Sequence, residues 1–361
     1  MSYGVRVVRS RAAMIAFLHV PFIVRTGAPN WVAPFETEVR RTLNVHRNPY
    51  FASASLRLFV CFRDDVPIAR LAVIISRAHE TKFGVRTAFF GFFESLNDTT
   101  ATQMLFDEAE RYCRQERVEV LEGPVSPNHY SEVGLQISGF DSLSSLFQPS
   151  NPSYYPALLE AAGFLMTEQM FTARNAGVSG FLRQEPLAAR SSGTPEGWVV
   201  RPVRLADYCL ELDRIREVFN DAFADNWHFL PVSREEYTFC TKDLKQITTP
   251  DLIRIVEYLG EPVGVLMCVL DVNPLLQPMH GKTGLFSYLR LRRGRRHIRN
   301  LIIYAVGIKR KFQSTRAFAL LLREARNIIS HFDSVETTWM MPGNILAIRA
   351  SKRLGMTPDK H

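Results

Sequence analysis

Apolar positions follow a strand pattern and then a helix pattern in the segment 301–322, which reads LIIYAVGIKRKFQSTRAFALLL. A continuous apolar run ends at Gly307 and predicts a buried strand, and a basic turn follows it. The stripe after the turn has helical spacing and predicts a helix packed on a sheet: Phe318, Leu321, Leu322, Ala325, Ile328, Ile329 and Phe332. A strand, a turn and a helix in this order can present free backbone N–H groups to a phosphate.

The same succession of elements occurs twice. VRVVR at 5–9 recurs as VRPVR at 200–204, and NPSYYPALLEAAGF at 151–164 resembles NILAIRASKRLGM at 344–356. An Asn-Trp pair and a turn proline also recur, and all offsets lie between 192 and 196 residues. This nearly constant offset predicts two copies of one fold. Each copy has strands and helices in mixed order, so the predicted fold class is mixed α/β.

The predicted domains are an N-terminal domain at 1–180, a linker at 181–197 and a C-terminal domain at 198–361. The linker contains RQEPLAARSSGTPEG, whose Pro, Gly and Ser content is typical of an exposed connection. Near the start, RVVRSRAAMIAFLHVPFIV resembles a signal peptide, but His19 and Pro21 interrupt its apolar run. We interpret it as a strand, a Ser10 cap and a helix. No apolar run approaches the ~20 residues of a transmembrane helix.

This order of elements resembles the GNAT superfamily of N-acyltransferases. GPVSPNHYSEVGLQISGF together with NPSYYPALLEAAGF resembles bacterial proteins built from two GNAT-like domains. The resemblance implies two tandem domains, each a mixed, mostly antiparallel sheet flanked by helices. It also implies acyl-CoA as donor, with its pantetheine arm along the fourth strand and its pyrophosphate at the next helix start. GNAT domains usually add a final strand, whereas only TPDKH follows RLGM here, so that strand is missing or another segment replaces it.

The resemblance places the donor site in the second domain. The implied cofactor-binding positions are Val306, Ile308, Lys309, Gln313, Ser314, Thr315, Arg316, Ala317 and Asn344. Ser314 and Arg316 stand where the family has glycines, which reduces close backbone approach, although nearby cations add charge-assisted contacts. An ordinary surface turn is an equal alternative. In the first domain, Glu94 and Asp98 are expected at the corresponding helix start, where they would repel a phosphate, so its donor site is predicted to be degenerate.

Three residues are candidates for catalysis. His228 lies in the segment that covers the acceptor site in GNAT folds, and an unperturbed imidazole titrates near neutrality. Tyr304 precedes the backbone at which an oxyanion would form, and Glu336 lies on the predicted fifth strand and could hold a water or the amine. The structural alternatives are a surface histidine beside Trp227, a packing tyrosine and a solvated glutamate. The tyrosine that many family members carry in the last helix is absent from AIRASKRLGM.

The net charge and the cysteine content limit the classes of binding partner that we expect. A net charge of +8 and a pI near 9.3 favour anionic partners. The run RLRRGRRHIR at 290–299 is a solvated basic face, or it contacts a donor phosphate, an acidic acyl-carrier protein or an anionic membrane. Its lack of interleaved aromatic residues argues against nucleic acid. The five cysteines are far apart, so we expect free thiols, no metal site and a cytoplasmic protein.

The predicted function is transfer of an acyl group from acyl-CoA, or from acyl-carrier phosphopantetheine, to the amine of a small molecule by direct attack in a ternary complex. The alternative is a non-catalytic GNAT-derived binding or scaffold protein, favoured by the lost glycines and the absent tyrosine. An open sheet edge leaves homodimer formation open.

Overall fold

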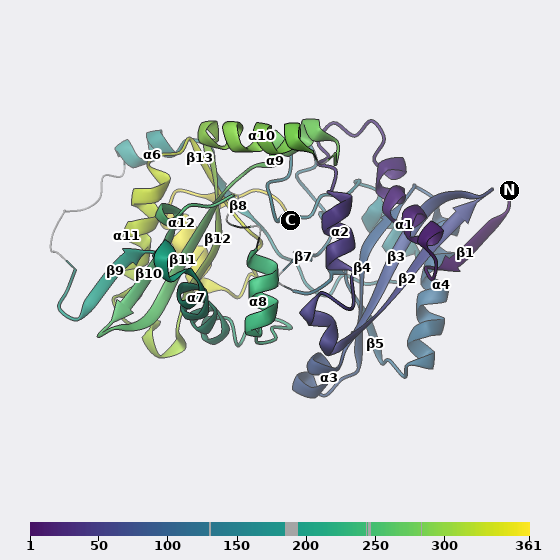
Figure 1. Ribbon diagram of the computed structural model, residues 1–361, viewed down its shortest axis with the longest axis horizontal. Helices are drawn as coiled ribbons and strands as arrows, with labels where there is room; N and C mark the ends of the chain where they lie inside the picture. Colours follow the sequence, from purple (N-terminus) through teal and green to yellow (C-terminus); the bar gives the residue numbers. More distant parts are fainter. Residues whose placement is uncertain (130, 185–193, 243, 245–246, 283) are drawn as a thin grey trace. The chain divides into compact units, whose positions relative to one another are not determined.

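The computed structural model describes residues 1–129, 131–184, 194–242, 244, 247–282 and 284–361, which form two compact units (Figure 1). Unit 1 comprises Met1–Glu168 and Leu276–Gly284. Unit 2 comprises Gln169–Leu275 and Leu285–His361. The first unit therefore ends before residue 180, where the sequence placed the domain boundary. Residues 185–193 of the predicted linker lie outside the described residues.

Unit 1 contains a five-stranded sheet in the order β1-β2-β3-β4-β5. The strands are β1 (Tyr3–Val7), β2 (Ala54–Arg63), β3 (Val66–Ser76), β4 (Thr87–Ser95) and β5 (Val120–Glu122). Neighbours pair antiparallel except β4 with β5, which are parallel. A short hairpin of β6 (Val125–Ser126) and β7 (Glu132–Val133) follows β5.

Helices cover both faces of this sheet. One core packs α1 (Arg11–Val24) on β2, with Phe17 and Val20 fully buried. The other packs α4 (Thr99–Gln115) and α5 (Tyr155–Ala161) on β3 and β4. Short helices α2 (Glu36–Thr42) and α3 (Arg77–Phe83) complete the unit.

Two helix starts follow from their capping residues. The Ser10 hydroxyl accepts a hydrogen bond from Ala13 N at 3.2 Å, which confirms the predicted cap of α1. Asp98 accepts from Ala101 N at 2.9 Å and caps α4, as expected. The expectation that Glu94 also joins this helix start is wrong, because Glu94 belongs to β4.

Unit 2 contains a seven-stranded sheet in the order β14-β8-β13-β12-β11-β10-β9. The strands are β8 (Ala173–Asn175), β9 (Trp198–Pro202), β10 (Ile253–Tyr258), β11 (Glu261–Leu270), β12 (Asn300–Ile308), β13 (Ser334–Thr337) and β14 (Thr357–Pro358). β8 lies between β13 and β14 and pairs antiparallel with both. β8 thus occupies the sheet position that the sequence left open, which explains why residues beyond 168 belong to unit 2.

The helices of unit 2 lie on both faces of its sheet. At Gly307 the sheet approaches Ala222, the last residue of α7 (Tyr208–Ala222), whereas Gly264 on the other face approaches Leu321 of α11 (Ala317–Ile329). The remaining helices are α6 (Val178–Gln184), α8 (Arg234–Thr241), α9 (Asn273–Leu276), α10 (Leu285–Gly294) and α12 (Ile345–Arg353). In the part of the chain that the structure describes, no helix has the length and apolar character needed to cross a membrane.

Candidate functional site

Strands β12 and β13 part in the middle of the unit 2 sheet. They pair in parallel as far as Ile303 and Thr337, where β13 ends, while β12 continues to Ile308. The chain beyond β13 pairs elsewhere, since Phe171 and Met340 exchange backbone hydrogen bonds of 3.0 and 2.8 Å. This second pairing holds the chain away from β12 and leaves a gap beside the end of that strand.

A β-bulge lies on β12 at the start of the gap. Cys268 of β11 is opposite Ile303, whereas the preceding Met267 is opposite Ala305. Tyr304 is therefore the extra residue of the bulge. Backbone N–H groups point alternately to the two neighbouring strands, and one extra residue shifts this alternation by one. Beyond the bulge, N–H groups that would have faced one neighbouring strand therefore face the other.

The bulge determines which N–H groups face the gap. Lys309 N donates to Val263 O of β11 at 2.9 Å. Because N–H groups alternate along a strand, those of Val306 and Ile308 face away from β11, toward the side that β13 has left. The backbone thus offers donors at Val306 and Ile308, two of the cofactor-binding positions that the family resemblance implies.

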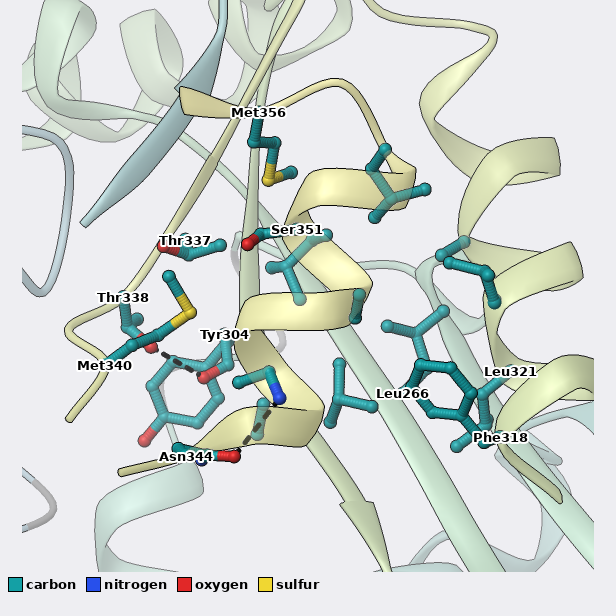
Figure 2. Close-up of a pocket in the computed structure, with 18 of the residues that line it drawn as sticks. Leu266, Tyr304, Phe318, Leu321, Thr337, Thr338, Met340, Asn344, Ser351 and Met356 are labelled. Atoms are coloured by element: carbon teal, nitrogen blue, oxygen red, sulfur yellow. Dashed lines mark hydrogen bonds between the residues drawn. The ribbon is translucent and has the colours of Figure 1, made fainter. Parts of the chain in front are cut away.

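A cavity of about 110 Å³ occupies the gap, between β12, α11 and α12 (Figure 2). This volume exceeds that of a single water several times over. Its lining is mostly apolar: Phe223, Leu266, Ile303, Tyr304, Ala305, Val306, Phe318, Leu321, Leu322, Ala325, Thr337, Thr338, Trp339, Met340, Asn344, Ala347, Ala350, Ser351, Leu354 and Met356. Such a lining suits an aliphatic chain better than a charged group.

A few polar groups lie in this apolar lining. Thr338 Oγ1 donates to the carbonyl of Tyr304 at 3.1 Å, and Asn344 caps α12 by accepting from Ala347 N at 3.1 Å (Figure 2). Burial raises the pKa of the Tyr304 phenol well above its usual value, and Cys240 contributes further. The Tyr304 hydroxyl is therefore protonated at neutral pH, so it is a hydrogen-bond donor and a weak acid and does not act as a base.

The basic turn before α11 is mostly neutralised by carboxylates. Lys309 is buried and its Nζ lies 2.6 Å from Glu217 and 3.1 Å from Glu261. Burial alone would lower the pKa of Lys309, but the hydrogen bonds to these glutamates outweigh it and the pKa is raised. Arg310 N donates to Asp221 at 2.6 Å. Lys309 and Arg310 thus fix the turn to α7 and to the start of β11.

The start of α11 is less occupied. Thr315 Oγ1 accepts from Ala317 N at 3.3 Å, and the Gln313 side chain lies 3.5 Å from the carbonyl of Ile308. Arg316 is the N-cap residue, makes no side-chain capping bond and is exposed, as is Ser314. Within the described residues, Arg316 has no ion pair, so its charge is available to a ligand.

The other two catalytic candidates do not line the cavity. His228 has a φ of 50° and packs edge-on against Trp227, with ring centroids 4.3 Å apart. Glu336 is buried and forms an ion pair with Arg174 of β8 at 3.1 Å. Strand alternation directs Glu336 away from the face on which Thr337 lines the cavity.

Sequence reasoning missed much of the cavity wall. It nominated Tyr304, Val306 and Asn344, which do line the cavity. It assigned the α11 stripe to packing, although Phe318, Leu321, Leu322 and Ala325 also line the cavity. Thr337, Thr338, Met340, Ala347, Ser351 and Met356 carried no signal, because their types and spacing are ordinary for a strand end and a helix.

The corresponding region of unit 1 is filled by the protein itself. Chain from the segment after β5 lies against β4, where a Cβ placed on Gly91 would be 1.9 Å from the carbonyl oxygen of Val125. Phe92 N donates to Ser126 Oγ at 2.8 Å. Backbone that faces a gap in unit 2 is thus covered by the β6 segment in unit 1.

Side chains complete this filling. The Tyr155 hydroxyl of α5 donates to Glu94 Oε2 at 2.6 Å and accepts from Ser95 N at 2.9 Å. The Tyr154 hydroxyl donates to the carbonyl of Ser95 at 2.9 Å. Burial, followed by the charge of Glu94, raises the pKa of Tyr155 well above its usual value, so this hydroxyl is a permanent donor.

Among the described residues, no group of three or more His, Cys, Asp or Glu side chains could hold a metal ion.

The chain is similar in sequence to two known proteins and in fold to a solved structure. No family model matches the chain. It is 26% identical over 362 residues to bacterial ceramide synthase from Caulobacter vibrioides (strain NA1000 / CB15N), covering 98% of this chain and 94% of that protein. It is 24% identical over 368 residues to Protein YghO from Escherichia coli (strain K12), covering 99% and 93%. The solved structure of a tandem GNAT protein from the clavulanic acid biosynthesis pathway matches with a TM-score of 0.55 and 13% identity, covering 99% of this chain and 96% of that one.

Proposed function

We propose that this chain, which has the tandem GNAT fold that its sequence predicted, is an N-acyltransferase whose acyl-thioester donor binds in unit 2. One observation carries the proposal: an apolar cavity lies where β12 and β13 part, between the bulge at Tyr304 and the starts of α11 and α12. The GNAT acyltransferase fold supports acyl transfer in general, and this cavity gives a thioester arm a place beside free backbone groups.

The donor is acyl-CoA or an acyl-carrier phosphopantetheine. Its pantetheine arm would lie along the parted edge of β12, where amide groups of the arm can pair with the backbone. Its phosphates would meet the N-terminus of α11, with Arg316 as the available cation, together with Gln313, Ser314 and Thr315. The Lys309 ammonium group is already paired with Glu217 and Glu261, so Lys309 fixes the conformation of the turn and does not bind the phosphates.

The backbone and one phenol supply the chemistry. When a neutral amine attacks the thioester carbonyl, negative charge develops on the carbonyl oxygen, and the N–H groups of Val306 and Ile308 face the gap where that oxygen would lie. The C–N bond forms and the C–S bond breaks; the new amide nitrogen releases one proton and the departing thiolate takes one up, so the net transfer is from nitrogen to sulfur. Tyr304 lines the cavity and is protonated, so its hydroxyl would donate a hydrogen bond to the departing sulfur, while the proton released by nitrogen would reach the thiolate through solvent. His228 and Glu336 have no place in this step, since neither lines the cavity.

The apolar cavity favours an aliphatic acyl chain and an amine acceptor of low polarity. The relative from Caulobacter is named a ceramide synthase, and a ceramide contains an acyl group on the nitrogen of a long-chain amine. We extend that substrate class to this chain as part of the proposal. Unit 1, whose groove is filled, would contribute to acceptor binding or to stability rather than donor binding.

The test is a panel of acyl-CoA thioesters of increasing chain length, each incubated with a mixture of amines that includes a long-chain amino alcohol. Mass spectrometry identifies acylated products and free CoA. Ala347→Phe places a ring in the cavity wall and should reduce turnover by at least about 100-fold, because it blocks the donor arm. Ala319→Phe makes the same substitution at an exposed position of the adjoining α11 and should leave turnover unchanged.

Two results would overturn the proposal. One is absence of turnover and of heat on titration with every thioester, which would favour a binding or scaffold protein. The other is turnover that Ala347→Phe leaves intact, which would place the chemistry outside this cavity.

A further inference from the structure

We infer that the arginine-rich surface formed by α10 and the turn after it binds anionic lipid membranes. This surface consists of Arg290, Arg292, Arg293, Arg296 and Arg299. It is separate from the donor cavity, which none of these residues lines. The inference therefore stands whether or not the proposed acyl transfer is correct.

The first argument is the absence of compensating charge nearby in the sequence. Between Asp271 and Glu324 the chain contains no aspartate or glutamate and twelve lysines or arginines. Lys309 and Arg310 in this stretch find carboxylates on other segments of unit 2. The arginine-rich surface does not, so its positive field is not cancelled locally.

The second argument is the state of the arginines themselves. Arg290, Arg292, Arg293 and Arg296 are exposed and make no ion pair or hydrogen bond within the described chain. Arg299 is also exposed and, among the residues that the structure describes, its side chain donates to the carbonyl of His331 alone, at 3.3 Å. By contrast, Arg40, Arg111 and Arg114 of unit 1 each pair with a carboxylate three or four residues away. The arginine-rich surface differs in that several arginines without an ion pair to any described residue lie close together in the sequence.

The third argument is the composition of the helix. α10 (green in Figure 1) reads LFSYLRLRRG, with large apolar and aromatic residues before the arginines. Clusters of basic residues on a helix are attracted to the negative surface potential of anionic lipids, by about 1 kcal/mol for each Lys or Arg near the surface. Arginine also pairs with lipid phosphates in bidentate geometry. A small soluble anion would require a shaped pocket, whereas several exposed arginines without ion pairs in the described chain match an extended layer of phosphates.

The test is co-sedimentation of the full chain with vesicles of phosphatidylcholine alone or of phosphatidylcholine and phosphatidylglycerol in equal parts. We expect binding to the anionic vesicles only. Raising the salt from about 0.1 M to about 1 M should release the protein, because the screening length falls from about 10 Å to about 3 Å. The triple variant R292Q/R293Q/R296Q should lower the partition coefficient about 100-fold, at about fivefold for each arginine.

The matched control is R40Q/R111Q/R114Q, which removes three ion-paired arginines from unit 1 and changes the net charge equally. It should bind like the wild type. Equal loss in both variants would mean that net charge alone drives binding and would overturn the inference. Binding to neutral vesicles, or to an oligonucleotide or an acyl-carrier protein in place of anionic vesicles, would overturn it as well.

Discussion

The gap beside β12 is open in unit 2, whereas the corresponding gap beside β4 is filled in unit 1. In unit 2 the chain leaves β13 to pair Met340 with Phe171, and an apolar cavity occupies the gap. In unit 1 the segment after β5 returns against β4, so that only a glycine fits at position 91. Repetition of a fold thus does not imply repetition of its site.

The difference arises from where each copy places its additional chain. Unit 1 uses the residues after β5 to cover its own parted strands, and the hydroxyls of Tyr154 and Tyr155, at the start of α5, bind the backbone of Ser95. Unit 2 receives β8 from the preceding segment, which completes the sheet beyond β13 without entering the gap. A filled gap contributes buried contacts, whereas an open one leaves surface for a ligand.

The largest expected effect compares two equivalent arginines. Arg201 is buried between Glu211 and Glu257, at 2.6 Å from each, whereas its counterpart Arg6 pairs with exposed Asp65. Arg201→Met leaves the fully buried Glu211 short of its principal partner and should cost about 3–5 kcal/mol of unfolding free energy. Arg6→Met should cost less than about 1 kcal/mol. Urea denaturation of both variants measures the difference, and equal losses would show that the two copies are energetically alike.

The next effect tests the filled groove itself. Tyr155→Phe leaves the Glu94 carboxylate and the Ser95 N–H without their buried partner, so we expect a loss of about 1–3 kcal/mol in unfolding free energy. Turnover per folded molecule should not change. Tyr258→Phe is the control, since its hydroxyl makes no hydrogen bond with the described residues. A fall in turnover without a loss of stability would instead give the Tyr155–Glu94 pair a role in the reaction.

A smaller effect separates two cations of the turn before α11. Arg316→Gln should raise KM for acyl-CoA about tenfold with little change in kcat, because it removes a charge-assisted contact to the donor phosphates. Arg310→Gln should change KM much less, because Asp221 and Asp225 already hold that side chain. Steady-state kinetics of both variants decide the point. A larger effect for Arg310 would move the phosphate site away from the N-terminus of α11.

The sequence predicted the parts of this comparison that depend on local pattern. The repeat, the capped helices at Ser10 and Asp98 and the strand, turn and helix around 301–322 all follow from short-range periodicity and capping. β8 could not be predicted, because a strand of three residues has no signature and pairs with residues more than 150 positions later. The carboxylate partners of Lys309 were equally hidden, since they lie 92 and 48 positions away.

The smallest effect concerns pH, and it should appear in unit 1 because titratable groups lie close together there. Desolvation, followed by the charge of Glu94, raises the pKa of Glu132 to about 7, although its side chain reaches the surface. Between pH 4.5, the ordinary pKa of a glutamate, and about pH 7 the folded state binds more protons than the unfolded state, so this carboxyl makes stability fall as pH rises through that window.

Glu132→Gln should therefore flatten the pH profile of stability, by no more than about 1 kcal/mol given the exposure of the side chain. Urea midpoints at about pH 5 and about pH 8 measure this, with Glu160→Gln at an exposed position of α5 as the control. If the pH profile of stability is unchanged or steeper in Glu132→Gln, the Glu132 carboxyl is charged in the folded state. The filled groove would then accommodate Glu94 and Glu132 as two carboxylates.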